Sequence, residues 1–210
     1  MTVTMSVGEA TRDRILRRAD QLFAAHGYAG VSMRLVAGAA GVTKPALYYH
    51  FRDKEALFEE CVLGSQRQME RLLREAATGD HSLAHRVTAT ALVLLTGSPH
   101  HPVRTQSDIA EHLDPGARLR LGEGFHDSIL GPVVELFAVA ASRGELRDAV
   151  QPSLAAATLL GVVMAFLPSV DPSGDPSWQV ARPNVEGTPS IDPAVAAELV
   201  ASLVLRGVSV

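Results

Sequence analysis

The residues with the clearest chemical use lie together near residue 45. A turn, Gly41-Val42-Thr43, separates two short segments of helical character, and the second presents four side chains on its outward face: Lys44, Pro45, Tyr48 and Tyr49. A lysine ammonium can donate to guanine O6 and N7, and a proline ring can pack on a thymine methyl group. Two short helices at this spacing are typical of a helix-turn-helix, whose second helix enters the major groove of DNA.

The two short helices need a shared apolar seam so that this face can point outward. Val36, Ala40 and Leu47 have the spacing to form that seam, and Val42 can fill the space between the helices. Phe51 follows the second of the two helices and is expected to be buried in the core. The segment therefore combines a buried side with a polar and aromatic side.

Capping residues delimit the N-terminal helices. Apolar side chains recur at helical spacing over residues 15–26, and Gly27 is expected to end that first helix in a left-handed conformation. The second helix is expected over Met33–Ala40 and the third up to about Tyr49. Ser, Thr and Asp side chains accept from the first free N–H groups of a helix. The expected N-caps of helices two, three and four are Ser32, Thr43 and Asp53.

The rest of the chain also has helical patterning. Pro132 is expected to kink or split one long helix because proline lacks the N–H that continues the hydrogen-bond ladder. A loop over 168–192 is proline-rich and unusually long for a compact domain, which indicates a disordered or functional segment. The expected helices beyond residue 80 are Leu83–Leu95, Val103–His112, Pro115–Ser142, Pro152–Leu167 and Pro193–Arg206.

Composition excludes several classes of protein. The 210 residues are 47% hydrophobic and 20% charged, which excludes wholesale disorder, and aromatic residues make up only 5%, which favours helix over a β-sandwich. The single cysteine, Cys61, excludes an intrachain disulfide scaffold and is expected to lie in the core. The longest apolar run, Ala155–Leu167, is too short to span a bilayer, and no signal-like segment opens the chain. We therefore expect a soluble, cytoplasmic protein with no membrane partner.

Charge is distributed unevenly along the chain. The formal net charge is −4, yet residues 1–55 carry eight basic groups against five acidic ones, whereas the remainder carries 11 against 18. A small basic region on an acidic body is expected of a nucleic-acid-binding domain joined to a second domain. The sequence thus predicts an all-α protein with a helix-turn-helix domain at 1–55 and a helical domain at 56–210.

Over residues 11–60 the sequence resembles the TetR family of bacterial transcriptional repressors. Beyond that range the likeness is weak, although Gly144-Glu145-Leu146-Arg147 and Leu205-Arg206-Gly207 are similar to family landmarks. A multi-part match is more specific than a lone motif. The segments that carry it are Thr11–Leu16, Leu22-Phe23, Gly27-Tyr28, Ala39–Thr43, Leu47–Phe51 and Lys54–Leu57.

The resemblance implies roles for eight residues in DNA binding. Those expected to face base edges are Arg34, Lys44, Pro45 and Tyr48. Those expected to hold phosphates are Thr43, Tyr49, His50 and Lys54. Hydroxyl, ring N–H and ammonium groups are suitable phosphate donors, and Lys54 also lies at a helix N-terminus that favours anions. Leu35 and Gly38 depart from the family pattern, which usually has polar or charged residues there.

The last two expected helices are apolar on more than one face, so they must be buried, either in an isologous dimer interface or in a thick monomer core. The resemblance implies the dimer, in which these helices form a four-helix contact, and a small-molecule effector pocket among the other helices. The candidate interface residues are Leu154, Leu160, Val163, Leu199 and Leu203.

Helix four contains Gly64-Ser65 near its middle, a pair at which helices commonly bend. Helix four is expected to be the only element shared by both domains, so an effector signal would pass along it. Gly64 is therefore a hinge candidate, with close packing of a neighbouring helix as the alternative explanation.

These features predict a ligand-responsive transcriptional regulator, most simply a repressor, that binds an inverted-repeat operator as a homodimer and is released by a small apolar effector. No nucleophile elbow, P-loop, zinc-helix motif or dinucleotide fingerprint is present, so we expect no enzyme and no cofactor. His81 and His85 have a spacing that could hold a metal, but no further ligand accompanies them, and no metal site is expected. The alternatives are a helical interaction protein and a nonspecific DNA binder.

Overall fold

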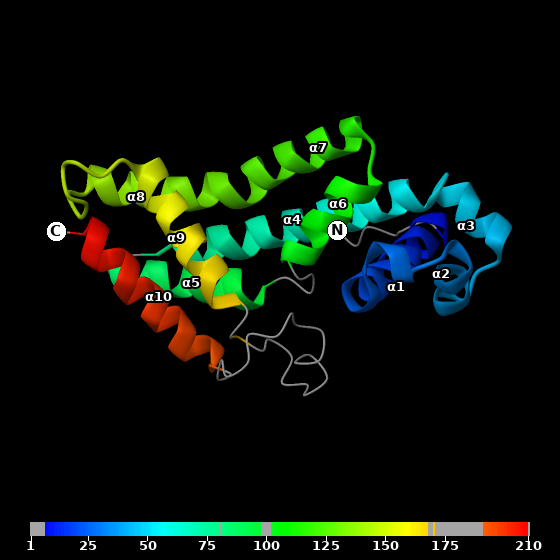
Figure 1. The fold of residues 1–210 in the computed structure, drawn as a ribbon, viewed down its shortest axis with the longest axis horizontal. Helices are drawn as coiled ribbons and strands as arrows, with labels where there is room; N and C mark the ends of the chain where they lie inside the picture. The colour runs from blue at the N-terminus through cyan, green and yellow to red at the C-terminus, as the bar shows by residue number, and fades with distance from the viewer. Residues whose placement is uncertain (1–6, 80, 98–101, 168–169, 171–190, 210) are drawn as a thin grey trace. The chain divides into compact units, whose positions relative to one another are not determined.

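The computed structural model describes residues 7–79, 81–97, 102–167, 170 and 191–209, and they form an all-α fold (Figure 1). Apart from turns and two isolated β-bridges, this part of the chain is helical. By its packing, the chain divides into two compact units. Unit 1 lies within Met1–Arg67 and Pro99–Gly124, and unit 2 lies within Gln68–Ser98 and Phe125–Val210.

Unit 1 contains the N-terminal helices and a segment from the middle of the chain. Its helices are α1 (Val7–Gly30), α2 (Met33–Ala40), α3 (Lys44–His50), the first part of α4 (Lys54–Ala77), α6 (Pro102–His112) and α7 (Pro115–Phe125) up to Gly124. They enclose an apolar core that includes Phe23, Leu47, Phe51, Phe58 and Leu121. Phe51 is therefore buried, as its sequence position predicted.

The two packing units do not coincide with the predicted functional domains, which meet between residues 55 and 56. Residues 102–124 pack with the N-terminal helices, and Leu113, Ala117 and Leu121 lie in the core of unit 1. The division into a DNA-binding domain at 1–55 and an effector domain at 56–210 stays a prediction about function.

Unit 2 is built around α5 (Leu83–Thr96), which packs on α8 (Gly131–Ser142), α9 (Pro152–Phe166) and α10 (Pro193–Val208). Its core includes Val87, Phe137, Leu159 and Val200. The last helix extends two residues beyond the expected end at Arg206, because the Ser209 N–H still bonds to the Leu205 carbonyl. The loop expected over 168–192 lies almost entirely outside the described residues.

The helical stretch Pro115–Ser142 is continuous in the structure but changes its hydrogen-bond pattern midway. A π-helical turn, η1 (His126–Leu130), separates α7 from α8, and Pro132 lies in the first turn of α8. The Gly131 N–H bonds to the His126 carbonyl, five residues back. Proline removes one donor from the ladder just beyond this turn, so the expected disruption at Pro132 takes the form of a π turn.

By length and composition alone, Pro115–Ser142 could cross a membrane. A core helix of a soluble protein passes the same test, and Val133, Leu136 and Phe137 of this stretch are buried in unit 2. Besides α4, this stretch also connects the two packing units. The chain passes from unit 1 to unit 2 within α4, at residues 67 and 68, and again between Gly124 and Phe125.

Candidate nucleic-acid interface

The helix-turn-helix is built as its capping residues predict. The Ser32 Oγ accepts from the Leu35 N–H, and the Thr43 Oγ1 accepts from the Ala46 N–H. Gly41 adopts a left-handed backbone with φ 63°, which a residue with a Cβ rarely adopts. Val36, Ala40 and Leu47 are all buried, so the predicted apolar seam between α2 and α3 is present.

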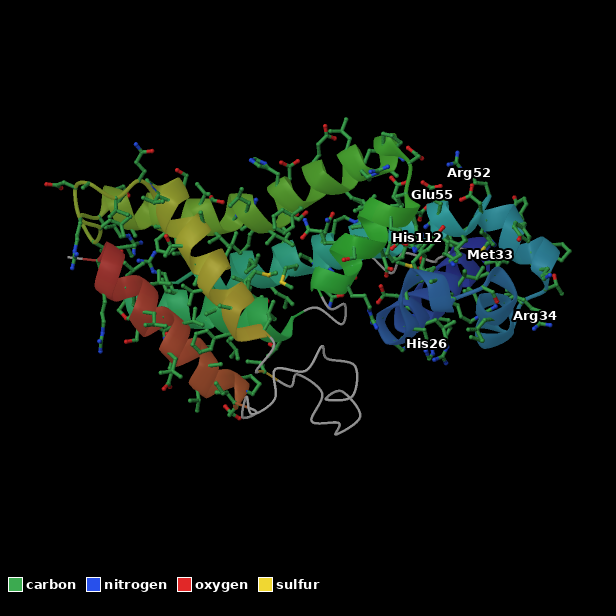
Figure 2. The ribbon with its side chains drawn as sticks, viewed as in Figure 1. His26, Met33, Arg34, Arg52, Glu55 and His112 are labelled. Carbon is green, nitrogen blue, oxygen red and sulfur yellow. The ribbon has the colours of Figure 1, made fainter. Side chains whose placement is uncertain are left out.

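The outward face of α3 is exposed. Lys44 and Pro45 are open to solvent, Tyr48 retains 48% of its accessible area, and Tyr49 retains 86%. These two adjacent tyrosines present their rings and hydroxyl groups to solvent and are not part of the apolar core. Arg34 also projects from α2 into solvent (Figure 2). The four residues expected to face bases are therefore all accessible.

The surface of α2 beside Arg34 is apolar rather than charged. Leu35 is exposed, and a Cβ added at Gly38 would meet no described atom within 4 Å. These two departures from the family pattern therefore lie on the open side of α2, where they do not disturb the packing of the motif.

The residues expected to hold phosphates have more varied environments. Thr43 is exposed and its oxygen also caps α3, while the half-buried His50 ring packs edge-on against Tyr49 at 5.2 Å between centroids. The Lys54 Nζ lies 3.9 Å from the centroid of the Tyr28 ring. Partial burial lowers the pKa of Lys54, while the Asp108 carboxylate opposes that shift.

Several contacts that hold the motif in place were missed from the sequence. The Arg14 Nε donates to the Ala40 carbonyl at 3.0 Å, which ties α1 to the end of α2. The Arg12 guanidinium pairs with Glu60 and lies 5.1 Å from the centroid of the Phe51 ring. No local sequence pattern predicts these contacts, because the two residues of each pair are 26 to 48 positions apart along the chain.

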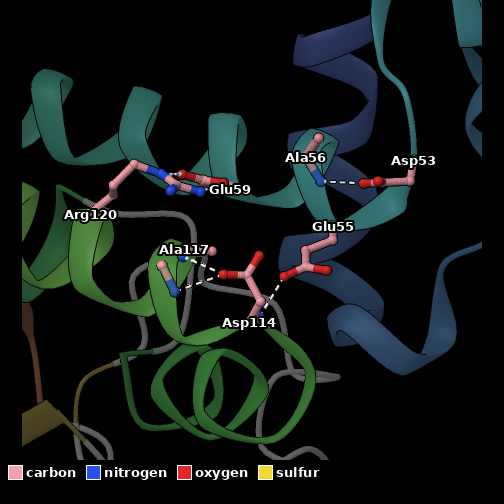
Figure 3. A network of polar contacts seen from close by, with 8 residues as sticks. Asp53, Glu55, Ala56, Glu59, Asp114, Ala117 and Arg120 are labelled. Carbon is pink, nitrogen blue, oxygen red and sulfur yellow. Dashed lines mark hydrogen bonds and ion pairs between the residues drawn. The ribbon is translucent and has the colours of Figure 1, made fainter.

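A polar network joins α7 to the first turns of α4 (Figure 3). The Asp53 Oδ1 caps α4 by accepting from the Ala56 N–H at 2.7 Å, as predicted. The Glu55 Oε1 accepts from the Asp114 N–H at 2.5 Å, and Arg120 donates to both oxygens of Glu59 at 2.5 and 2.9 Å. The network fixes the start of α4, which is where Lys54 lies.

Asp114 is itself a cap within this network. Its Oδ1 accepts from the N–H groups of Gly116 at 2.7 Å and Ala117 at 3.0 Å. The hydrogen bond from Ala117 contributes most to lowering the pKa of the Asp114 carboxyl. The loop between α6 and α7 is thus ordered by a carboxylate that is stabilised in its charged form.

The candidate dimer residues do not share one environment. Leu154, Leu199 and Leu203 are exposed, and Leu160 is half-buried. Val163 retains only 3% of its accessible area because it packs in the core of unit 2. Val163 is therefore not part of an exposed surface. The sequence could not show this, because α9 is apolar on every face and has no periodicity that separates inward from outward residues.

Gly64 and the histidine pair are also placed by the structure. A Cβ added at Gly64 meets no described atom within 4 Å, so close packing of a neighbouring helix does not explain this glycine.

The His81 and His85 rings lie 4.5 Å apart between centroids, and both residues are exposed. Among the described residues no group of three potential metal ligands occurs. Cys61 is buried, as expected, and burial raises the pKa of its thiol.

Comparison with known proteins decides the family. Residues 15–61 match the model of the bacterial regulatory proteins of the tetR family. The chain is 30% identical to the HTH-type transcriptional repressor BepR of Brucella suis over 175 residues, which are 80% of this chain and 83% of BepR. This chain belongs to the TetR family. It is accordingly a transcriptional regulator with a helix-turn-helix DNA-binding region, and the family is not one of enzymes.

Other relatives extend the likeness beyond the motif. The TetR-family chain is 25% identical to the regulator UidR of Escherichia coli K12 over 167 residues, which are 78% of this chain and 83% of UidR. It also has the fold of a TetR-family regulator from Mesorhizobium loti, with a TM-score of 0.70, 20% identity, and coverage of 98% of this chain and 100% of the other. The fold of the whole chain, and not only its N-terminal helices, is therefore that of TetR-family regulators.

Proposed function

We propose that this TetR-family regulator is a repressor that binds an inverted-repeat operator as a homodimer and is released by a small apolar effector. The observation that carries the DNA-binding part is the solvent-exposed face of Lys44, Pro45, Tyr48 and Tyr49 on a helix whose opposite side is buried. A cytoplasmic location is part of the proposal, since the operator DNA of a bacterium lies there.

Base and phosphate contacts are proposed to fall to different residues. Arg34, Lys44, Pro45 and Tyr48 read bases, and Thr43, Tyr49, His50 and Lys54 hold phosphates.

Lys44→Ala should relax base preference and cost roughly 1–3 kcal/mol of binding free energy at its position. Lys54→Ala should weaken all duplexes alike and lower the slope of log affinity against log salt by about one unit per subunit. Selection of bound duplexes from a random pool, followed by salt titrations, measures both. Equal loss of preference in the two variants would contradict the division.

The dimer interface is proposed to lie on the exposed face of α9 and α10. Exposed apolar side chains gather on these two helices, which pack on each other: Leu154, Met164, Val195, Leu199 and Leu203. Leu160 is at the edge of this face, and Val163 is left out because it belongs to the core. Gly161 and Gly207 have no described atom near an added Cβ, which leaves room for close approach of a second copy.

Light scattering with operator titration tests the dimer. Leu199→Glu should give a monomer and weaken operator binding, because a charge in an apolar interface would be buried without a partner. Leu119→Glu, an equally drastic change at an exposed leucine of α7, serves as the matched control and should stay dimeric. The selected operators should have half-site centres about 34–36 Å apart, or a multiple of that distance. Unpaired half-sites would contradict the proposal.

Two alternative functions have distinct outcomes in these experiments. A helical interaction protein would give no salt-sensitive shift with duplex DNA. A nonspecific DNA binder would shift every duplex and return no preferred sequence from the random pool.

A further inference from the structure

Tyr28 lies at the meeting point of three helices in unit 1. It follows Gly27, the kink of α1, and its ring is half-buried. The Lys54 Nζ of α4 lies 3.9 Å from the centroid of this ring, and the His112 ring of α6 stacks on it with 4.8 Å between centroids and 21° between planes. Phe58 adds an edge-on contact at 5.2 Å. One aromatic ring therefore contacts a candidate phosphate ligand and the last residue of α6 together.

The backbone around Tyr28 is held by the same helix. The Asp108 Oδ2 of α6 accepts from the Tyr28 N–H at 2.9 Å, and the Arg104 guanidinium donates to the Ala24 carbonyl. Gly27 has φ 70°, and a Cβ at that position would approach the Asp108 Oδ2 to 3.3 Å. The end of α1 is thus fixed on α6 through the main chain as well as through the Tyr28 ring.

This arrangement limits the positions available to the Lys54 ammonium. A lysine side chain in solvent must lose rotamer freedom when it binds a phosphate, and that loss weakens binding. An ammonium held over an aromatic face has already lost part of that freedom, while the N–H groups that point away from the ring can still donate. Lys54 is also the first residue of α4, where main-chain N–H groups favour an anion.

We propose that Tyr28 and His112 are positioning residues for DNA binding, through which α6 holds Lys54 ready for a backbone phosphate. The inference rests on the proposed function of the DNA-binding surface. It adds that α6, which contributes none of the proposed base-reading residues, influences the affinity for DNA. The contacts that carry it lie within unit 1. They require no bending of α4, so this route is separate from the hinge at Gly64.

Substitutions of His112 test the role of its ring. His112→Leu removes the stacking partner and should weaken binding to a selected operator and to a random-sequence duplex alike, by roughly three- to tenfold. The slope of log affinity against log salt should fall by about one unit per subunit, as for Lys54→Ala. His112→Phe keeps a ring that can stack and should bind as the parent does. Far-UV circular dichroism and thermal unfolding establish that the variants compared are folded.

A double-mutant cycle separates positioning from a merely structural role. In a Lys54→Met protein, His112→Leu should cause no further loss of affinity, because the group that His112 positions is gone. Additive losses would overturn the inference, as would an unchanged salt slope in the single variant. Tyr28→Phe keeps the aromatic face and should bind normally, whereas Tyr28→Leu should lose affinity. Tighter binding by Tyr28→Leu would show that Tyr28 withholds Lys54 from DNA, and would also overturn it.

The outcomes distinguish this inference from the proposed function. If the parent protein binds duplex DNA but the losses from the Lys54 and His112 substitutions are additive, the inference alone is overturned. A parent protein that binds no duplex at all overturns both, because a lysine that meets no phosphate needs no positioning.

Discussion

Unit 1 and unit 2 use charge in different ways. In unit 2, α5, α8, α9 and α10 enclose an apolar core that contains one buried guanidinium, Arg86, paired with Glu145 at 2.6 Å. In unit 1 the charged contacts lie around the core, where acidic and basic side chains of α1, α4, α6 and α7 join helices that are distant in sequence. Burial of apolar surface dominates stability in both. Unit 2 also has an exposed ion pair of this kind, between Arg74 of α4 and Glu135 of α8. The difference between the units is therefore the buried Arg86 charge of unit 2, which depends on Glu145, whereas the ion pairs of unit 1 are at least partly exposed.

The largest effect is expected at the buried Arg86 charge. The Arg86 side chain retains 2% of its accessible area, and its Nε has no hydrogen-bond partner in the described part of the chain. Glu145→Ala would leave the guanidinium buried without a counter-charge, at a cost of about 3 kcal/mol in the free energy of unfolding. Arg86→Met, the matched control, removes the charge and leaves a more exposed carboxylate, so it should cost much less. Chemical denaturation at fixed protein concentration measures both, and equal losses would contradict the contrast between the units.

A smaller effect is expected where α4 and α7 approach closely in unit 1. The buried Gln66 Nε2 donates to the Leu121 carbonyl at 3.0 Å, and a Cβ at Gly124 would lie 2.3 Å from the Gln66 Oε1. Gly124→Ala must therefore displace the buried Gln66 amide, whose nitrogen makes this bond. Gly122→Ala on the same helix meets no described atom within 4 Å and gains only helix propensity. Gly124→Ala should be less stable than Gly122→Ala by about 1–3 kcal/mol. Two variants of equal stability would show that Gln66 moves without cost.

The features predicted correctly from the sequence are those that a few neighbouring residues determine. Ser32, Thr43 and Asp53 cap the expected helices, and Gly41 makes the expected turn after the second helix. Gly27 interrupts the first helix as expected, but with φ 70° and an extended ψ of 177° instead of a left-handed helical backbone, and α1 continues to Gly30. Each of these depends on hydrogen bonds or backbone angles within about one helical turn, which a local pattern specifies. The disruption near Pro132 is predictable for the same reason.

The features that were missed depend on long-range packing. Tyr28 and Asp108 are 80 residues apart, and Glu55 and Asp114 are 59 apart, so no spacing rule connects them. For the same reason, the sequence did not reveal that residues 102–124 pack with the N-terminal helices. The inward direction of Val163 was hidden because α9 is apolar on all sides, which removes the periodicity that separates core from surface.

The smallest change in stability is expected at Gly64, which lies within one turn of the point where α4 passes from unit 1 to unit 2. A Cβ there meets no described atom within 4 Å, so Gly64→Ala should stabilise α4 by at most about 1 kcal/mol and leave operator affinity without effector nearly unchanged. If ligand acts by bending α4 at Gly64, the alanine should stiffen the helix and reduce the coupling between effector and operator, which is typically ~1–3 kcal/mol.

Linkage makes this coupling measurable from either side. An effector that weakens operator binding must bind more weakly to the operator complex by the same factor. A small apolar compound found by screening for operator release can be titrated with and without operator, in the parent, Gly64→Ala and Gly122→Ala proteins. Gly122→Ala is the control because it also replaces an unobstructed helical glycine, on the second helical stretch that connects the units. Reduced coupling in Gly64→Ala alone assigns the bend to α4. A reduction in Gly122→Ala instead would assign it to the stretch with the π turn, and equal coupling in all three proteins would refute a glycine hinge.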